Sequence, residues 1–216
     1  CGQNDPTGCV TQWAYNGLNT EQTNPRGHKH YRRTNALGQL IRSEDHLGTV
    51  VTYEYDAFDN LINTTKSATG LPDVIVSMGY DLRGHKTSMT DPDMGSWTYQ
   101  YNTFGELISQ TDAKNQTVDM SYDALGRMTE RMDPDGETVW IYDTLKPGLL
   151  TSVTYSQNGN TQYQRTYQYN ANNQLTHERV SIQSGPQRAT QFTYTAYGQH
   201  RDTIYPGGFR TRNFYN

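Results

Sequence analysis

The sequence has few aliphatic side chains. Leu, Ile, Val and Phe together make up 34 of its 216 residues, or about 16%, which falls below the roughly 20% at which disorder is suspected. That rule also requires a high net charge, and the formal charge here is only −4. The 17 Tyr and 3 Trp supply the missing area, because tyrosine buries a large ring while its hydroxyl stays at a wet edge. The composition therefore predicts an ordered chain with a thin sheet and no thick core.

Other absences exclude classes of protein. No run approaches 18 apolar residues, so no segment is predicted to span a membrane. The charges are scattered and the pI is near 5.8, so the basic stripe of a nucleic-acid binder is missing and no nucleic-acid partner is predicted. The chain opens with polar CGQNDPTG and no apolar signal segment follows. We expect a piece of a longer protein, because the chain ends on a fresh copy of the repeat described below.

The two cysteines, Cys1 and Cys9, lie eight residues apart in a segment rich in Gly, Asn and Pro. A disulfide that closes this small loop and a pair of free thiols both remain open. No histidine pair lies at the spacing of a zinc finger, so a zinc site is not predicted there.

What the chain does contain is a repeat. The clearest copy runs from Thr117 to Asp143, as TVDMSYD-ALG-RMTERMD-PDG-ETVWIYD. Three strand-like heptads alternate there with two three-residue turns, and diluted copies occur in both directions. Successive copies begin 19, 21, 25, 21, 21, 20, 27, 25 and 21 residues apart. A period near 21 that changes only by insertion is typical of stacked supersecondary units. The copies are marked by Tyr15-Asn16, Thr34-Asn35, Tyr55-Asp56, Tyr80-Asp81, Tyr101-Asn102, Tyr122-Asp123, Tyr142-Asp143, Tyr169-Asn170, Tyr194-Thr195 and Tyr215-Asn216.

One repeat corresponds to one β-hairpin, because two strands of six or seven residues and two short turns use about 21 residues. Asn158-Gly159 is a good hairpin signal, and the insertion at residues 67–73 is placed at the tip of a longer hairpin. Gly, Pro, Asn and Asp interrupt every window before a helix could form. The sequence therefore predicts an all-β chain of tandem hairpins that form a long, curved antiparallel sheet. We expect residues 1–12 to be a turn-rich lead-in and residues 13–216 to be one repeat domain of nine to ten copies.

Several positions recur in phase and are predicted to be structural. An aromatic residue or Met often precedes the Tyr by two, a Gly or Asn follows by three or four, and an apolar residue often follows by six. Aromatic cross-strand pairs between copies are expected to set the register. The predicted structural repeat positions are Tyr55, Asp56, Tyr80, Asp81, Gly84, Tyr101, Gly105, Tyr122, Asp123, Gly126, Arg127, Trp140, Tyr142, Asp143, Tyr169, Tyr194 and Gly198.

The recurring Asp invites a catalytic or calcium-binding interpretation. Its replacement by Asn in several copies instead favours a turn role, because an Asx turn needs an oxygen atom and no charge. Asp91-Pro-Asp93 and Asp133-Pro-Asp135-Gly136 lack the ligand order of a calcium loop and are predicted to be turns. No cofactor site is predicted.

His28 and His30 share one face of a strand at a usable ligand spacing, but no third ligand is identifiable nearby, so a metal site is not predicted. The chain contains no GxSxG elbow, no recognisable Cys/His arrangement and no phosphate-binding Gly loop. We therefore predict no catalytic residues and no enzyme activity.

The motif Tyr122-Asp123-Ala-Leu-Gly126-Arg127, followed by Asp133-Pro-Asp-Gly136, resembles the YD repeat of the Rhs family, which includes bacterial polymorphic toxins, Tc toxin components and teneurins. The likeness runs from about Trp13 to Asn216. It implies a sheet strip that spirals into a hollow cocoon or barrel-like shell and, in the bacterial toxins, encloses a C-terminal toxic domain. The family's aspartyl autoproteolysis region after the repeats has no match in this chain.

Two hypotheses follow from the resemblance. The first is a structural shell segment of a secreted Rhs-type toxin, whose partners are the rest of the shell and the enclosed C-terminal toxin domain. The alternative is an extracellular recognition module that binds cell-surface glycans or a protein partner, as in teneurins, because exposed Tyr and Trp are good interface anchors. In both cases the secreted or extracellular location is implied by the family.

Overall fold

The computed structural model describes residues 10–183 and 185–215, and these residues contain nineteen strands and no helix. The prediction of an all-β chain of hairpins is confirmed. Within this part of the chain, no helix is available to cross a membrane. Cys1, Cys9 and most of the expected lead-in lie outside the described residues.

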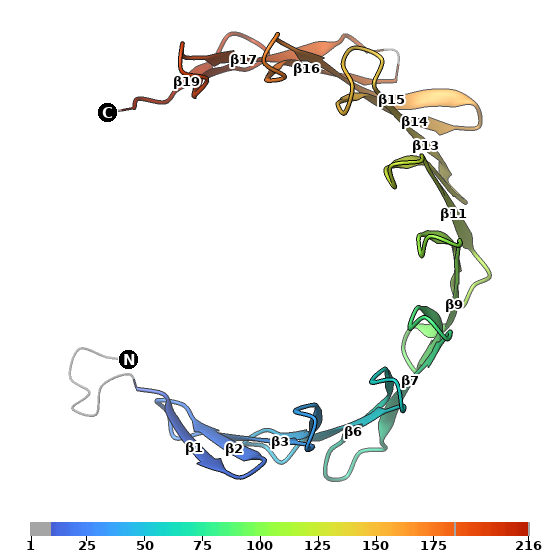
Figure 1. Ribbon diagram of the computed structural model, residues 1–216, viewed down its shortest axis with the longest axis vertical. Coiled ribbons are helices and arrows are strands. Elements are labelled where there is room, and N and C mark those ends of the chain that lie inside the picture. The colour runs from blue at the N-terminus through green and yellow to red at the C-terminus, as the bar shows by residue number, and fades with distance from the viewer. Residues whose placement is uncertain (1–9, 184, 216) are drawn as a thin grey trace. The chain divides into compact units, whose positions relative to one another are not determined.

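The strands fall into two compact units, which we describe separately (Figure 1). The first unit holds the described residues up to Gln100 together with Thr111–Asn115. In it, each strand from β1 to β9 pairs antiparallel with the next one along the chain, as a meander. Its strands are β1 (Gln12–Asn16), β2 (Asn19–Thr23), β3 (Lys29–Thr34), β4 (Leu40–Glu44), β5 (Val50–Tyr55), β6 (Leu61–Ser67), β7 (Val74–Tyr80), β8 (Lys86–Asp91) and most of β9 (Gly95–Tyr101).

The second unit holds Tyr101–Gln110 and the described residues from Gln116 onward. Its strands continue as an antiparallel meander from β11 to β19, with β10 next to β11. They are β10 (Leu107–Thr111), β11 (Thr117–Tyr122), β12 (Met128–Asp133), β13 (Gly136–Tyr142), β14 (Leu150–Gln157), β15 (Asn160–Tyr169), β16 (Leu175–Ile182), β17 (Arg188–Tyr194), β18 (His200–Ile204) and β19 (Arg210–Arg212).

The turns follow from the residues that form them. Asn158 and Gly159 have φ of 50° and 73° and join β14 to β15 as a two-residue turn. Positive φ at both central residues is the requirement of a type I′ turn, and Asn-Gly satisfies it. The longer hairpin predicted around residues 67–73 is also present, because β6 and β7 pair up to Lys66 and Val74 and enclose the insertion.

Most repeat tyrosines sit beside a β-bulge. In the hairpin of β5 and β6, for example, the register shifts between Glu54 and Tyr55, and Tyr55 then pairs with Leu61. The apolar residue six positions after the Tyr is therefore its cross-strand partner, because the bulge inserts one extra residue on one side. The same shift occurs at Thr34, Tyr80, Tyr122, Tyr142, Tyr169 and Tyr194.

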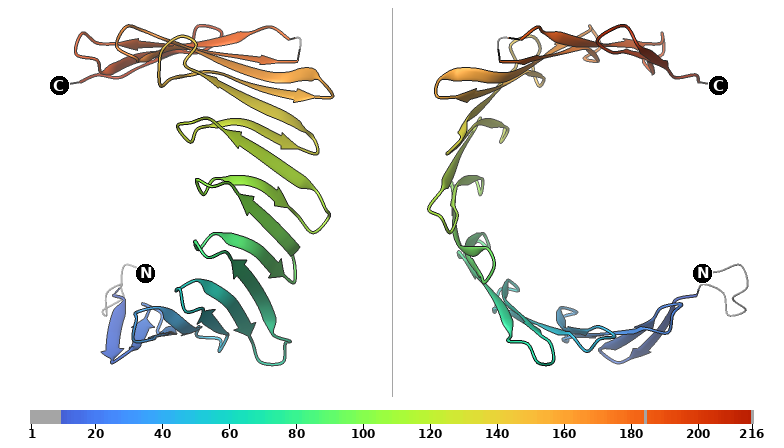
Figure 2. Two further views of the ribbon diagram at one scale, coloured as in Figure 1. Left: turned by 45° about the vertical axis from the view of Figure 1, so that its right-hand side comes forward. Right: turned by 180° about the vertical axis from the view of Figure 1, so that it is seen from behind.

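Each unit is a single layer of strands (Figure 2). No hydrophobic residue in the described part of the chain is buried, and the buried residues are Ser152, Asp202 and Thr203. Stability must therefore come from the hydrogen-bonded ladder, half-buried side chains and contacts between neighbouring turns. This agrees with the thin sheet that the composition predicts.

Candidate functional site

The most regular site in the molecule is the turn that follows each repeat Tyr. We call it the YD turn and define it by residues 35–39, 56–60, 81–85, 102–106, 123–127, 170–174 and 195–199. In the turn that begins at Asp123, its Oδ1 accepts the backbone N–H groups of Leu125 at 2.9 Å and Arg127 at 3.0 Å. The backbone N–H of Gly126 donates to the carbonyl of Asp123 at 3.0 Å. The first residue of the turn thus acts as an Asx cap that needs only an oxygen atom.

A second side chain completes each YD turn that begins with Asp or Asn. The residue four positions after the Asp or Asn faces it, and its hydrogen-bonding character is complementary. Where the first residue is Asp56, Asn60 donates to its carboxylate at 2.9 Å. Where the first residue is Asn102, the carboxylate of Glu106 accepts from its amide at 2.6 Å. Asp81–His85 and Asp123–Arg127 follow the first arrangement, and Asn35–Gln39 and Asn170–Gln174 follow the second.

The repeat tyrosines join neighbouring repeats through their hydroxyl groups. The Tyr55 hydroxyl donates to the carbonyl of Leu40 at 2.9 Å, and Tyr80 donates in the same way to Leu61 at 2.9 Å. The Tyr and the residue whose carbonyl it contacts lie 15 positions apart in some repeats and 19 in others. The contact therefore persists when the chain between the two residues is longer. Equivalent bonds link Tyr122 to Leu107, Tyr169 to Leu150, Tyr194 to Leu175 and Tyr215 to His200.

These bonds change the expected role of the tyrosines. Aromatic pairs across strands are expected to set the register, but the directly opposed aromatic pair, Tyr155 and Tyr163, is not among the predicted repeat positions. The recurrent contact is a hydroxyl-to-carbonyl hydrogen bond instead. The ring supplies half-buried area, and the hydroxyl satisfies a carbonyl at the start of the adjacent strand.

Side chains also link turns of neighbouring repeats. The guanidinium of Arg127 bonds Asp123 and reaches Asp143 of the next repeat at 2.5 Å, while its Cζ atom lies 4.3 Å from the centre of the Tyr142 ring. Lys146 donates to the carbonyl of Asn170 at 2.5 Å. Gln174 then donates to the carbonyl of Gly198 at 2.8 Å. In the first unit, Gln39 donates to Asp59 at 3.1 Å. Side chains therefore join turns of neighbouring repeats at these places in both units.

The electrostatics of the turns agree with these contacts. The side-chain hydrogen bond from Arg127, with two backbone N–H donors, holds the pKa of Asp123 below its ordinary value. Asn60 and its backbone N–H do the same for the pKa of Asp56. Burial raises the pKa of the Tyr122 hydroxyl, and the charge of Glu106 adds to that effect. The lowered pKa keeps the two Asp side chains ionised as acceptors, and the raised pKa keeps the Tyr122 hydroxyl protonated as a donor.

The tips of the YD turns carry exposed apolar side chains. Leu37 is 75% exposed and Phe58 is 74% exposed, each two residues after the start of its turn. In the first unit these turns curl toward the concave side of its sheet (Figure 1). The corresponding tips in the second unit include Phe104, Leu125 and Tyr197.

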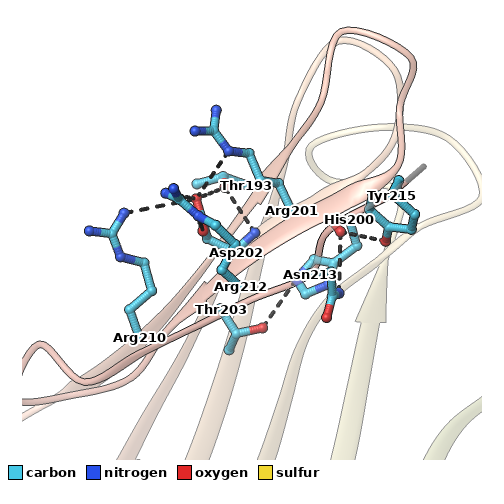
Figure 3. A network of polar contacts seen from close by, with 9 residues as sticks. All are labelled: Thr193, His200, Arg201, Asp202, Thr203, Arg210, Arg212, Asn213 and Tyr215. Atoms are coloured by element: carbon cyan, nitrogen blue, oxygen red, sulfur yellow. Dashed lines mark hydrogen bonds and ion pairs between the residues drawn. The ribbon is translucent and has the colours of Figure 1, made fainter.

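A different polar cluster surrounds Asp202 in β18 (Figure 3). This carboxylate is 4% exposed, and it accepts from Arg212 at 2.6 Å and from the Thr193 hydroxyl at 3.0 Å. Arg201 and Arg210 approach it at 3.7 and 4.0 Å. The bond from Arg212 holds the pKa of Asp202 below its ordinary value. Sequence reasoning missed this cluster, because its residues do not recur with the repeat.

The other residues considered from the sequence lie in ordinary surroundings. Asp91 and Asp133 cap turns through backbone N–H groups. His28 stacks on His46 with ring centres 4.1 Å apart, while His30 lies in β3 opposite Gln22. Among the described residues, three or more His, Cys, Asp or Glu side chains do not gather in a way that could hold a metal ion.

The tyrosines among the predicted repeat positions end strands, and the Asp residues among them follow directly after those strands. Gly84, Gly105, Gly126 and Gly198 have φ between 74° and 83°. Trp140 lies within β13 opposite Val153. Fold and site together define a protein built of tandem β-hairpin repeats, joined through their turns.

Comparison with known proteins gives the family. The family model described as RHS Repeat matches residues 35–71, 80–117, 101–138 and 122–159, which together cover more than half of the chain. The chain belongs to this repeat family. It is 28% identical over 107 residues to double-stranded DNA deaminase toxin A of Burkholderia cenocepacia strain H111, across 49% of this chain and 7% of the toxin.

Solved structures share the fold. The crystal structure of TcdB2-TccC3 without its hypervariable C-terminal region superposes with a TM-score of 0.69 and 16% identity, over 87% of this chain and 12% of that one. The Tc holotoxin pore of Photorhabdus luminescens gives a TM-score of 0.63 and 14% identity, over 87% of this chain and 13% of that one. The chain thus spans about a tenth of the length of these proteins, and at this level of identity the likeness concerns the fold.

Proposed function

We propose that this chain is a stretch of wall in a hollow β-sheet shell that encloses a toxic C-terminal domain of the same protein. The observation that carries the proposal is that side chains join turns of neighbouring repeats in both units, each of which is a single layer of strands. A wall of this kind needs lateral connection between repeats, because it has no second layer to pack against. Residues 13–216 would form one continuous repeat domain of this wall, in a secreted toxin.

The exposed turn tips support an enclosing role. A monomeric surface seldom carries many large apolar side chains in register without a partner, and here the turns that carry them curl toward the concave side of the first unit. An enclosed domain would supply that partner. The remaining wall and the enclosed domain are accordingly the proposed partners, and the chain's part is structural and non-catalytic.

Proteolysis of the full-length protein tests this proposal. We expect its C-terminal domain to resist a protease that degrades the same domain when it is expressed alone. Replacing Tyr80 and Tyr122 by Ala together should open the wall and expose the domain, whereas Tyr15→Ala, at a ring that is 75% exposed, should not. Equal cleavage rates for the domain inside the full protein and alone would overturn the proposal.

A further inference from the structure

Two arginines face each other across β3 and β4, and no contact within the described part of the fold accounts for placing two like charges together. Arg33 lies directly opposite Arg42 in the antiparallel register. Like charges at opposed positions destabilise a sheet. Arg42 has a partner, because its guanidinium bonds Glu44 at 2.9 Å. Within the described residues, Arg33 makes no side-chain hydrogen bond or ion pair.

The pair lies in a groove on one face of the first four strands. Opposed residues of an antiparallel sheet share a face, so the register sets two rows of side chains on that face. One row is Ala14, Glu21, Tyr31 and Glu44, and the next is Asn16, Asn19, Arg33 and Arg42. All eight line a groove of about 410 Å³.

The groove is mixed in chemistry and carries more positive than negative side chains. Lys29 bonds Glu21 at 2.7 Å at one end of the first row, and Arg42 bonds Glu44 beside the second. Of the cations in these two rows, Arg33 is left without a carboxylate partner among the described residues, and Arg32 adds a further positive charge to the lining of the groove. Around it, the amides of Asn16 and Asn19 offer both donors and acceptors, and the carboxylates of the groove offer acceptors alone. The half-exposed ring of Tyr31 adds an apolar platform.

We infer that this groove binds an acidic saccharide, with its single carboxylate on Arg33 and Arg42 and its hydroxyls on the amides and carboxylates beside them. A guanidinium pair is suited to a carboxylate because it donates in a fixed, forked geometry. The carboxylates of Glu21 and Glu44 can accept hydrogen bonds from hydroxyl groups, so the groove favours a ligand with many hydroxyls and one negative group. This inference does not rest on the shell role.

Binding to the full chain is measured by calorimetry and saturation-transfer NMR with methyl glucuronide and methyl glucoside. The two probes share a sugar ring and differ in one carboxylate. We expect the glucuronide to bind more tightly by about tenfold or more, the gain of charge-assisted hydrogen bonds. Arg33→Gln should abolish that preference, and Tyr31→Ala should lower the affinity for both probes. Arg188→Gln, on β17, is the matched control and should change neither.

Three results would overturn the inference. One is equal affinity for the two probes, or no binding of either at millimolar concentration. Another is binding of sodium acetate as strong as that of the glucuronide, which would mean a bare anion site. The third is an unchanged preference in Arg33→Gln. Folding of this variant is checked by its thermal midpoint without ligand, which we expect to rise because the like-charge pair is gone.

Discussion

At the scale of the residue, the first position of each YD turn selects its partner by hydrogen-bond polarity. Asp56 faces a donor in Asn60, and Asn102 faces an acceptor in Glu106. The backbone contacts are the same in both turns, because one side-chain oxygen accepts the N–H groups two and four residues on. The first residue can therefore be charged Asp or neutral Asn, provided that the residue four positions on donates to the second Asp oxygen or accepts from the Asn amide.

The turn at Asn102 allows this pairing to be tested. Asn102→Asp should destabilise the protein, because its new carboxylate would meet that of Glu106 where a donor now stands. Adding Glu106→Gln should restore stability, since the pair then matches Asp56 and Asn60. The double variant should be more stable than the sum of the two single changes, as measured by urea denaturation. Additive single effects would contradict the pairing.

The tyrosine hydroxyl makes a second prediction at this scale. Tyr122→Phe keeps the ring and removes the donor to the carbonyl of Leu107, which lies 2.9 Å away. We expect a loss of about 0.5–1.5 kcal/mol in the free energy of unfolding, the usual net value of such a bond. Tyr15→Phe, at an exposed ring, should leave the denaturation midpoint unchanged. A loss of the same size in both variants would argue against the hydroxyl bond.

At the scale of the element, the repeated unit is a hairpin whose register shifts at the Tyr. The shift lets the Tyr pair with the residue six positions later while the turn between them keeps its Asx geometry. The turn also needs one residue with positive φ, which is usually Gly. Asn173 and Asp59 fill the same place with φ of 62° and 70°, so the requirement is conformational and not specific to glycine.

Gly126 tests that requirement. Its φ is 74°, and an added Cβ would stand 3.1 Å from a carboxylate oxygen of Glu106. Gly126→Ala should lower the free energy of unfolding by about 1 kcal/mol or more. Gly126→Asn should cost less, because Asn tolerates the left-handed conformation. Thermal melts of the two variants compare them, and equal losses would mean that crowding by the Cβ, and not φ, sets the cost.

At the scale of the whole molecule, the tyrosine bonds repeat in both units and should act together in alkaline solution. Burial raises the pKa of Tyr80, Tyr122, Tyr169 and Tyr194 above the ordinary value. A group whose pKa is higher in the folded state contributes stability that is fully present below its unfolded pKa, about 10 for tyrosine. That contribution is lost as the pH rises through the folded pKa.

We therefore expect the melting temperature to fall above pH 10, together with the appearance of tyrosinate absorbance near 295 nm. Replacing these four tyrosines by Phe should lower stability at pH 8 and flatten the alkaline decline. A decline that stays as steep in the fourfold variant would assign it to other groups, such as the lysines.

Much of the architecture was accessible from the sequence. The period near 21, the Asn158-Gly159 turn and the absence of helical patterns predicted tandem hairpins, because turn chemistry and strand alternation are local properties. The Asx role of the repeated Asp was also visible, since Asn replaces it in several copies. The complementary residue four positions on was present in the sequence, but its meaning depends on knowing which atoms face each other.

Tertiary structure decided the contacts that join one repeat to another. The bulge at each Tyr, the hydroxyl bond to a carbonyl 15 or 19 residues earlier and the link from Arg127 to Asp143 all depend on register between strands. The cluster around Asp202 and the apposition of Arg33 and Arg42 depend on it in the same way. The sequence alone determined what each hairpin is, because local backbone preferences specify turns and strands. Only the folded sheet decided which side chains meet, because a shift of one residue in pairing would send each of them to the opposite face.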